Sequence, residues 1–468
     1  MATETAKTGR VLTVWTPEDK AFWQQQGEAI ARINLWISVP CLFLAFAVWQ
    51  MWSVIAVNLN ALGFKFTTDQ LFWLAALPSL SGATLRIFYS FMVPVVGGRR
   101  WTALSTASLL IPAIGIGIAI QDTTTSYATF LALAVLCGFG GGNFSSSMAN
   151  ISFFFPKDRK GSALGVNAGL GNLGVSSVQF LAPLVIAAGV YGPLGGDPQV
   201  IVNQAGQQVN IWAQNAAYVW VPFIAICSIA AWFGMNDIAD AKASVREQAV
   251  IFKRKHNWIM CWLYLGTFGS FIGYSAGFPL LIKQSFPEIN PLQFAWIGPL
   301  IGAAIRPFGG WLSDKLGGAS VTFWNFIVMA AAVGGVLWFL PSGGSGGSFA
   351  GFFACFMLLF LTTGIGNGST FRMIPVIFLT ERQRAAKGGD AAAQEQAVKD
   401  GNKEGAAVLG FSGAIGAYGG FFIPKSYGTS ITMTGGPEMA LYLFIVFYLT
   451  CIVTTWWYYA RRNAEMPC

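Results

Sequence analysis

Long apolar segments recur along the whole chain, and they constrain its fold more than any other feature of the sequence. Each segment is long enough to cross about 30 Å of hydrocarbon as a helix. They are predicted at 35–57, 70–96, 101–120, 126–155, 162–189 and 216–236, and again at 258–284, 293–313, 320–341, 350–379, 405–430 and 437–460. Twelve spans, six on each side of a polar stretch, predict an all-α membrane protein.

The composition favours the same interpretation. Only 10% of the 468 residues are charged, against about 25% in ordinary soluble domains, so polar side chains cannot cover a water-facing surface. The net charge of +8 indicates basic loops that set the orientation in a membrane rather than nucleic-acid binding. The first 34 residues are polar and lack the apolar core and cleavage site of a signal peptide.

The basic residues predict the orientation of the spans. With both termini in the cytoplasm, 22 of the 28 Lys and Arg residues lie on that side, and only Lys65, Lys283 and Lys425 lie on the other. This bias is the positive-inside signal of a multi-pass protein. We therefore expect two six-helix bundles, at 35–236 and 258–460, joined by a cytoplasmic loop at 237–257. Cytoplasmic tails are expected at 1–34 and 461–468.

An internal repeat relates the two halves of the chain. A shift of 220 residues places 82–88 on 302–308, and Gly97-Gly98 on Gly317-Gly318. A shift of 245 residues aligns Leu164-Gly165, Gly171 and Gly174 with Leu409-Gly410, Gly416 and Gly419. Two pseudo-symmetric six-helix halves with a site at their interface are a common transporter design.

Charged side chains inside the spans are functional candidates, because each costs from about 3 to more than 10 kcal/mol in a membrane. Arg86 lies midway along the second span, Arg306 well inside the eighth, and no Asp or Glu lies centrally in any span. A bound anion is the simplest source of the missing negative charge, since guanidinium groups match planar oxyanions with paired donors. The alternative is an arginine satisfied by backbone carbonyls. Arg372, near the end of the tenth span, either reaches the cytoplasmic interface or belongs to the pathway.

Glycine-rich runs mark the fifth and eleventh spans. Glycines at spacings of three and four let a second helix approach closely. A packing or conformational role is therefore expected for Gly165, Gly169, Gly171, Gly174, Gly410, Gly413, Gly416 and Gly419. Asn172, within the first run, differs from them, because a buried amide needs a partner that a polar anion or pore water would provide.

The sequence indicates no metal site, no cofactor and no enzyme. Seven cysteines are scattered without a metal-ligand or disulfide spacing, and His256 is the only histidine. No nucleophile–base set is visible, and we expect no buried histidine. The polar segment from Ala386 to Gly405 is predicted to be a cytoplasmic loop with some helix.

Several motifs resemble a known family. Residues 310–318 resemble the signature between helices eight and nine of the major facilitator superfamily, whereas the first-half copy has Pro94 in place of the acidic residue. Further blocks resemble the nitrate/nitrite porter family of that superfamily, and they lie at 66–71, Arg86, 97–101, 148–156, 169–174, 267–273 and 419–424. The similarity extends from about Trp15 to Trp457.

This resemblance implies a major facilitator fold and a role in nitrate and nitrite transport, nitrate assimilation included, across a bacterial inner membrane. It implies that the repeat-related Arg86 and Arg306 bind the anion between the halves. The aromatic Phe144 would stack on the anion, and the pocket would be completed by Tyr264, Phe268 and Asn172. The chain departs from some relatives that carry serine at Gly413 or glutamine at Arg372.

With no central carboxylate in the spans, alternating-access exchange of nitrate for nitrite is the favoured mechanism. An empty site would hold two arginines whose repulsion opposes closure, so only the loaded carrier would cross readily between states. Proton-coupled nitrate import or nitrite export, a gated anion channel and a nitrate-binding sensor are the alternatives. The expected partners are nitrate, nitrite and membrane lipid, with no nucleic acid and with the chain as a monomer.

Overall fold

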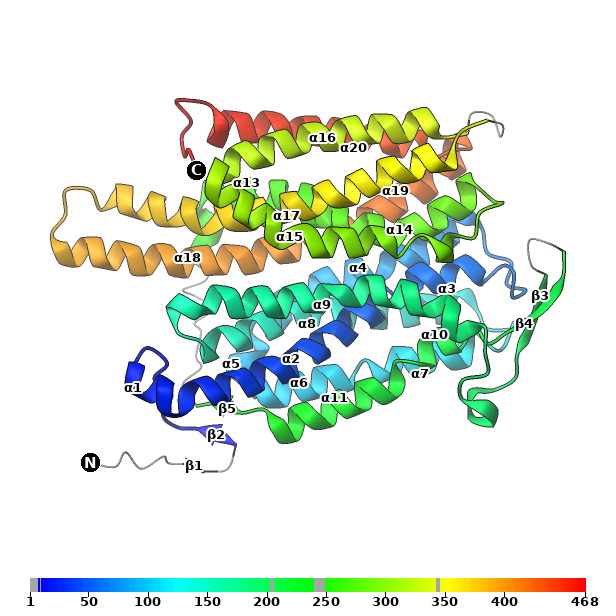
Figure 1. The fold of residues 1–468 in the computed structure, drawn as a ribbon, viewed down its shortest axis with the longest axis horizontal. Helices are drawn as coiled ribbons and strands as arrows, with labels where there is room; N and C mark the ends of the chain where they lie inside the picture. Colours follow the sequence, from blue (N-terminus) through cyan, green and yellow to red (C-terminus); the bar gives the residue numbers. More distant parts are fainter. Residues whose placement is uncertain (1–6, 9, 203–205, 240–248, 342–345) are drawn as a thin grey trace. The chain divides into compact units, whose positions relative to one another are not determined.

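The computed structural model consists mainly of long helices (Figure 1). It describes residues 7–8, 10–202, 206–239, 249–341 and 346–468. Within these residues, 11 helical stretches are long and apolar enough to cross a membrane. The remaining predicted span, 293–313, coincides with helix α15 (Ile297–Leu316), which carries the charged residues Arg306, Asp314 and Lys315.

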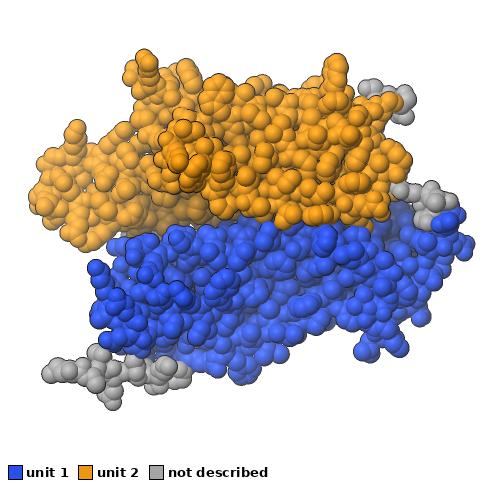
Figure 2. All heavy atoms as spheres, in the orientation of Figure 1, with its two compact units in different colours: residues 1–67, 77–243 blue, residues 68–76, 244–468 orange. Residues whose placement is uncertain are grey.

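The chain forms two compact units, which Figure 2 distinguishes by colour. Unit 1 comprises Met1–Thr67 and Leu77–Ala243, and unit 2 comprises Thr68–Ala76 and Ser244–Cys468. Helix α4 (Thr68–Tyr89) is therefore shared, because its first residues pack within unit 2 and the rest within unit 1. Pro78 lies inside this helix, close to the point where it passes from one unit to the other.

Unit 1 is built from helices and two small sheets. Strand β2 (Val11–Leu12) pairs with β1 (Lys7–Thr8) and, in parallel, with β5 (Asp237–Ile238). Strand β3 (Gln199–Val202) pairs antiparallel with β4 (Gln208–Ile211). Its other helices are α1 (Lys20–Phe22), α2 (Glu28–Trp49), α3 (Trp52–Asn58), α5 (Met92–Val96), α6 (Gly98–Ala107), α7 (Leu110–Ala119), α8 (Tyr127–Phe154), α9 (Lys157–Ile186), α10 (Asn215–Tyr218) and α11 (Val221–Gly234).

Unit 2 is helical in its described part. A π-helical stretch, Leu265–Gly269, joins the first two helices of the unit into one continuous span. Besides α15, the long helices are α13 (Lys255–Tyr264), α14 (Ser270–Ser285), α16 (Gly318–Phe339), α17 (Phe349–Ala385), α18 (Ala391–Ala417), α19 (Gly419–Thr434) and α20 (Glu438–Thr455).

The glycine pairs of the internal repeat form equivalent turns in the two units. Gly97 ends α5 with φ of 97°, and Gly317 ends α15 with φ of 85°. Glycine adopts this left-handed region without the steric cost of a Cβ. In each unit the next helix begins at the following residue, Gly98 or Gly318, so the repeat seen in the sequence is also a repeat of backbone geometry.

The polar segment from Ala386 to Gly405, predicted as a loop with some helix, is more helical than expected, with a loop only before Ala391. Helix α17 continues to Ala385 and α18 begins at Ala391, and the two project as a hairpin from unit 2 (Figure 1). Asp390 caps α18 by accepting the backbone N–H of Ala393 at 2.8 Å. At the base of the hairpin, Glu404 accepts hydrogen bonds from Arg254, at 3.1 Å, and from Arg382.

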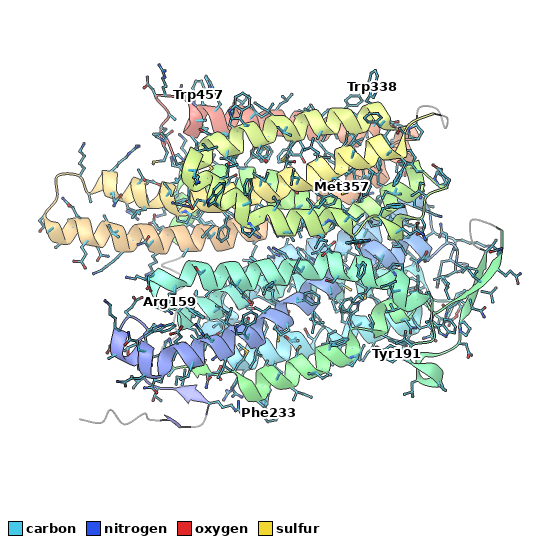
Figure 3. All side chains as sticks on the ribbon, in the orientation of Figure 1. Arg159, Tyr191, Phe233, Trp338, Met357 and Trp457 are labelled. Atoms are coloured by element: carbon cyan, nitrogen blue, oxygen red, sulfur yellow. The ribbon has the colours of Figure 1, made fainter. Side chains whose placement is uncertain are left out.

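Large apolar side chains cover the outside of each unit. Phe233, Trp338 and Trp457 all point outward, and Trp338 is 84% exposed (Figure 3). Soluble monomers rarely expose extended apolar patches. Lipid is the environment in which such a surface is stable.

Candidate functional site

Arg86 is buried in unit 1, with only 1% of its surface exposed. Its Nε donates a hydrogen bond to the carbonyl oxygen of Gly141 in α8, at 2.9 Å. Its guanidinium carbon lies 4.6 Å from the centre of the Phe144 ring and 5.0 Å from that of Trp49. The guanidinium is thus held by a carbonyl at one edge and by the faces of aromatic rings, which attract cations.

Glycines in α8 allow this close approach. A Cβ on Gly141 would lie 2.8 Å from the Cα of Gly82 in α4 and 2.7 Å from the Trp49 ring. Because neither glycine has a side chain, the backbones of α4 and α8 meet directly one turn before Arg86. The predicted site residue Phe144 lies one turn further along α8, where its ring contacts Arg86 and packs edge-on against Phe46.

Arg306 lies in α15 of unit 2 and is half-buried. Its Nη2 donates a hydrogen bond to the hydroxyl of Tyr264 at 3.3 Å, and its guanidinium carbon lies 5.2 Å from the centre of the Phe371 ring. Its Nη1 is buried and has no hydrogen-bond partner within the part of the chain that the structure describes. A buried donor without a partner is costly, so a ligand that accepts a hydrogen bond would be stabilised here.

Tyr264 and Phe268, both predicted site residues, form one side of the surroundings of Arg306. Their rings stack with centres 5.5 Å apart and planes 28° apart, and both are buried. A Cβ on Gly416 of α18 would lie 2.9 Å from the Tyr264 ring and 3.1 Å from the Phe268 ring. The structure thus brings three of the predicted residues together in unit 2, with a glycine holding the aromatic pair in place.

Asn172 lies in α9 of unit 1 and is fully buried. Its Oδ1 has no hydrogen-bond partner among the described residues. Asn172 and Arg86 lie in the same unit, but no hydrogen bond joins them in its described part. An unsatisfied buried amide is consistent with a polar ligand.

The glycines of the two glycine-rich runs, in the fifth and eleventh spans, differ in their surroundings. A Cβ on Gly171 would lie 2.7 Å from Leu42, and one on Gly174 would collide with the carbonyl oxygen of Phe43 in α2. Gly416 contacts Tyr264, and Gly419 contacts the backbone of Gly269. Tight packing is therefore observed at these four positions. No described atom lies within 4 Å of a Cβ built on Gly165, Gly169 or Gly410.

Arg372 contacts the motif between α15 and α16. Its Nε donates to the carboxylate of Asp314, and both side chains are about half exposed. This pairing lies at the end of α15 and within unit 2. Arg372 therefore acts in the structure as the ion-pair partner of the motif's acidic residue.

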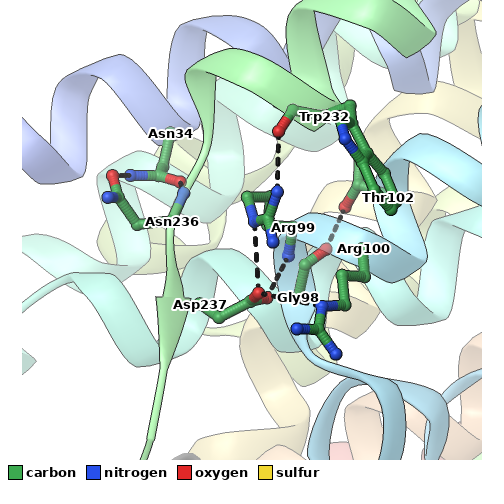
Figure 4. A network of polar contacts seen from close by, with 8 residues as sticks. All are labelled: Asn34, Gly98, Arg99, Arg100, Thr102, Trp232, Asn236 and Asp237. Carbon is green, nitrogen blue, oxygen red and sulfur yellow. Dashed lines mark hydrogen bonds and ion pairs between the residues drawn. The ribbon is translucent and has the colours of Figure 1, made fainter. Parts of the chain in front are cut away.

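The corresponding motif in unit 1 has an acidic partner that the sequence analysis missed. Asp237, just after α11, accepts the backbone N–H of Arg99 at 2.8 Å and its Nε at 3.2 Å (Figure 4). Arg99 also donates from Nη1 to the carbonyl oxygen of Trp232. Asp237 thus caps the start of α6 and supplies an acidic group to a motif that has Pro94 in place of its own acidic residue. The signal in the sequence was an Asp directly after the sixth span.

The expectation of no buried histidine was wrong. His256, at the start of α13, is 3% exposed, and its Nδ1 lies 2.9 Å from the hydroxyl of Tyr459. Its Nε2 lies 3.5 Å from Glu465, whose pKa is held below its usual value by the hydrogen bond from Lys255. His256 therefore belongs to a polar cluster at one end of unit 2 rather than to the surroundings of Arg306.

Metal and disulfide chemistry has no counterpart in the described residues. They contain no group of three or more His, Cys, Asp or Glu side chains that could hold a metal ion. All seven cysteines are free, and four of them, Cys41, Cys137, Cys261 and Cys451, are buried. The site's polar chemistry is that of arginine, asparagine and tyrosine.

Two helical units with an apolar exterior, each with an arginine embedded among aromatic rings, define a multi-pass membrane protein of the transporter class. The family model described as Major Facilitator Superfamily matches residues 39–388. The nitrate/nitrite transporter NarU of Salmonella typhimurium is 55% identical over 458 residues, with 97% of each chain covered. NarU of Escherichia coli is 54% identical with 99% coverage of each chain.

A more distant relative is the probable nitrate/nitrite antiporter NarK2 of Thermus thermophilus, which is 40% identical over 98% of this chain and 99% of its own. The chain therefore belongs to the nitrate/nitrite porter family of the Major Facilitator Superfamily. Among solved structures, a bacterial homologue of the lysosomal transporter Spinster matches with a TM-score of 0.62 at 13% identity, covering 90% of this chain and 95% of that one. This likeness confirms the predicted fold.

Proposed function

We propose that the protein transports nitrate and nitrite across a bacterial inner membrane by alternating access, and that it exchanges nitrate for nitrite. The observation that carries this proposal is the presence of one membrane-embedded arginine on each of two repeat-related helices, Arg86 on α4 and Arg306 on α15. The names of the relatives, which are similar over nearly the whole chain, support these substrates. We propose transport without an enzymatic reaction.

In this proposal, Arg86 and Arg306 supply the paired N–H donors that a planar oxyanion accepts. Arg86 is fixed by Gly141 and by the rings around it, so its guanidinium needs little reordering when the anion arrives. Phe144 presents an aromatic surface beside Arg86, and Asn172 supplies a polar group. Beside Arg306, Tyr264 and Phe268 supply a polar hydroxyl and an aromatic surface, and Nη1 of Arg306 is available to the anion.

Exchange follows from the charge of these residues. Without an anion, the two positive guanidinium groups repel each other in low-dielectric surroundings, and this repulsion disfavours the states through which the carrier must pass. A bound nitrate or nitrite neutralises part of that charge, so the loaded carrier changes state and the empty carrier does not. We place both termini in the cytoplasm, with bundles at 35–236 and 258–460 that act as a monomer in the lipid bilayer.

Counterflow in proteoliposomes tests this function. The purified protein is reconstituted in vesicles loaded with nitrite, with nitrate or with no permeant anion, and uptake of labelled nitrate is followed with and without a pH gradient. We expect uptake only into vesicles that contain nitrite or nitrate, with no requirement for the gradient. Chloride or sulfate inside the vesicles should not replace them.

Three outcomes would contradict the proposal. Nitrate uptake into anion-free vesicles driven by a pH gradient would indicate proton coupling instead of exchange. A steady conductance far above carrier turnover would indicate a channel. Normal exchange by the Arg86→Lys or Arg306→Lys variants, which keep the charge but lose the paired donors, would exclude the assigned roles of these residues. Arg462→Lys, at an exposed position, is the matched control.

A further inference from the structure

Helix α17 contributes a surface next to Arg306 that the sequence analysis did not assign. A Cβ on Gly368 would collide with the carbonyl oxygen of Arg306, and one on Gly364 would collide with that of Gly302. These glycines allow α17 to lie directly on α15. Phe371, on the same face, places its ring against the guanidinium of Arg306.

A neighbouring face of α17 contacts the π-helical stretch Leu265–Gly269, which follows Tyr264 and contains Phe268. There the hydroxyl of Thr370 lies 3.0 Å from the hydroxyl of Thr267. At 3.6 residues per turn, Asn367 is offset by about 40° from Phe371 and by about 60° from Thr370, between the two. The position of Asn367 around the helix therefore lies between the face of α17 against α15 and the face against the π-helical stretch, and Arg306 of α15 bonds there with Tyr264.

The amide of Asn367 has unused hydrogen-bonding capacity in this position. The residue is 2% exposed, and its Oδ1 has no hydrogen-bond partner among the residues that the structure describes. Buried amides in proteins are nearly always satisfied, because an unmade hydrogen bond is costly in an apolar environment. Nη1 of Arg306 is a buried donor that also has no hydrogen-bond partner among the described residues. An unsatisfied acceptor and an unsatisfied donor therefore lie on adjoining faces of α17 and α15.

We propose that Asn367 is a further anion-binding residue, which acts together with Arg306. In the loaded state its Nδ2 donates to an oxygen of the anion while its Oδ1 accepts from Nη1 of Arg306. The hydroxyl of Tyr264 already accepts from Nη2 of the same guanidinium. Two oxygen acceptors then hold the guanidinium in one orientation and leave its other N–H groups for the anion. This inference rests on the proposed transport of nitrate and nitrite.

The test compares nitrate binding and exchange by full-length Asn367→Asp and Asn367→Leu variants with the wild type. The aspartate is nearly the same size but negative, so at pH 7.5 it neutralises Arg306 and competes with the anion. We expect its Kd for nitrate to rise about 10-fold or more, and to recover as the pH falls and the new carboxyl is protonated. The leucine variant should raise Kd at every pH.

Asn325→Leu is the matched control. Asn325 in α16 is also a buried amide against α17, but it lies beside Gly366, which is about 100° around the helix from Asn367 and farther from Arg306 than Phe371 is. Its replacement should leave the Kd for nitrate unchanged even if the melting temperature falls. A purely structural role of Asn367 would likewise lower the melting temperature without creating pH-dependent binding.

The results separate this inference from the proposed function. If the wild type neither binds nitrate nor exchanges it, the proposed function fails. If the wild type binds nitrate and Asn367→Asp binds it equally well at pH 7.5, only the role of Asn367 is overturned. Should the aspartate variant not fold, an unchanged Kd in Asn367→Leu overturns the inference alone.

Discussion

At Arg306 the surrounding groups determine the direction in which the guanidinium can donate. Tyr264 holds Nη2, and the Phe371 ring lies against the guanidinium, while Nη1 has no partner among the described residues. A guanidinium is planar, so fixing one edge and one face restricts the remaining N–H groups to one side. If Arg306 binds the anion, as we propose, these neighbours contribute to recognition by orienting its guanidinium.

Tyr264→Phe tests this orientation at the level of one hydroxyl. The variant keeps the ring stacked on Phe268 but loses the acceptor for Nη2, so Arg306 should be less well ordered. We expect the KM for nitrate in exchange assays to rise about 10-fold, because a hydrogen bond to a charged group is lost. The melting temperature should change little.

Tyr448→Phe provides the control for this prediction. Tyr448 is also a buried tyrosine, but its hydroxyl bonds with Ser270 and Tyr274 at 2.7 and 2.6 Å. Its loss should lower the melting temperature and leave the KM unchanged. An equal rise in KM in both variants, or none in Tyr264→Phe, would show that the hydroxyl of Tyr264 does not orient Arg306.

Part of this site could be predicted from single residues and part could not. Arg86 and Arg306 stand out because charge is rare in the spans, and their contacts with Phe144 and Tyr264 agree with the resemblance. Phe371 and Trp49 have no such signal, since 15% of the chain is aromatic and most of these rings pack in cores or face lipid. Asn367 follows a glycine, as Asn172 does, but only the packing of α17 on α15 distinguishes it.

At the scale of helices, the sequence predicts membrane spans well and their extensions poorly. Burial in lipid requires a continuous apolar run, so each span leaves a clear signal. The end of α17 and the start of α18 lie beyond that requirement, so their polar residues predict a loop with some helix and not the full extent of the two helices. The passage of α4 from unit 2 to unit 1 leaves no periodic signal either, since it depends on contacts distant in the sequence.

The first turns of α4 are attached to α19 by a small set of contacts. Lys425 pairs with Asp69, and its ammonium lies 4.9 Å from the centre of the Trp73 ring. Phe72 packs against Tyr427 with ring centres 6.1 Å apart. Pro78 follows and cannot donate a helical hydrogen bond, which weakens the connection between this part of α4 and the part that carries Arg86.

Asp69→Asn should therefore loosen the start of α4. The pair is only about one quarter exposed, so we expect a loss of about 1 kcal/mol of stability and a fall in melting temperature of about 1–2 °C. Exchanging the charges, with Asp69→Lys and Lys425→Asp together, should restore part of the loss. Differential scanning fluorimetry of the purified protein measures both effects.

Glu395→Gln is the control for the ion pair. It removes a pair with Lys399 that is more than half exposed and lies within α18, and it should leave the melting temperature unchanged. If Asp69→Asn is as stable as the wild type, or if the charge exchange is no better than the single variants, the ion pair does not hold α4.

For the molecule as a whole, the internal repeat explains why two units carry equivalent features. Gly97 and Gly317 form the same turn, and an acidic side chain lies at each motif. Asp314 belongs to its motif and pairs with Arg372, whereas Asp237 lies beyond α11 and pairs with Arg99. The two units therefore share the backbone turn but differ in the polar contacts around it. Arg86 and Arg306 are the charged pair that occupies equivalent positions in both units, and this equivalence favours a shared function.

A shared function predicts a property of the whole protein. A ligand that binds only the folded state stabilises it by mass action, by about 2.7 kcal/mol at 100 times its Kd. For a chain of 468 residues this corresponds to a rise in melting temperature of about 2–3 °C. We expect this rise with nitrate and with nitrite, and not with sulfate at equal ionic strength, because a divalent anion loses far more hydration free energy than a monovalent one when it enters a buried site.

The variants decide whether both units contribute to this stabilisation. If Arg86 and Arg306 bind the same anion, then Arg86→Lys and Arg306→Lys should each abolish the rise with nitrate, although each changes only one unit. Two independent weak sites would instead leave about half of the rise in each single variant. Equal stabilisation of the wild type by nitrate and sulfate would reflect a general salt effect, and would remove the physical basis for assigning an anion to this pair of arginines.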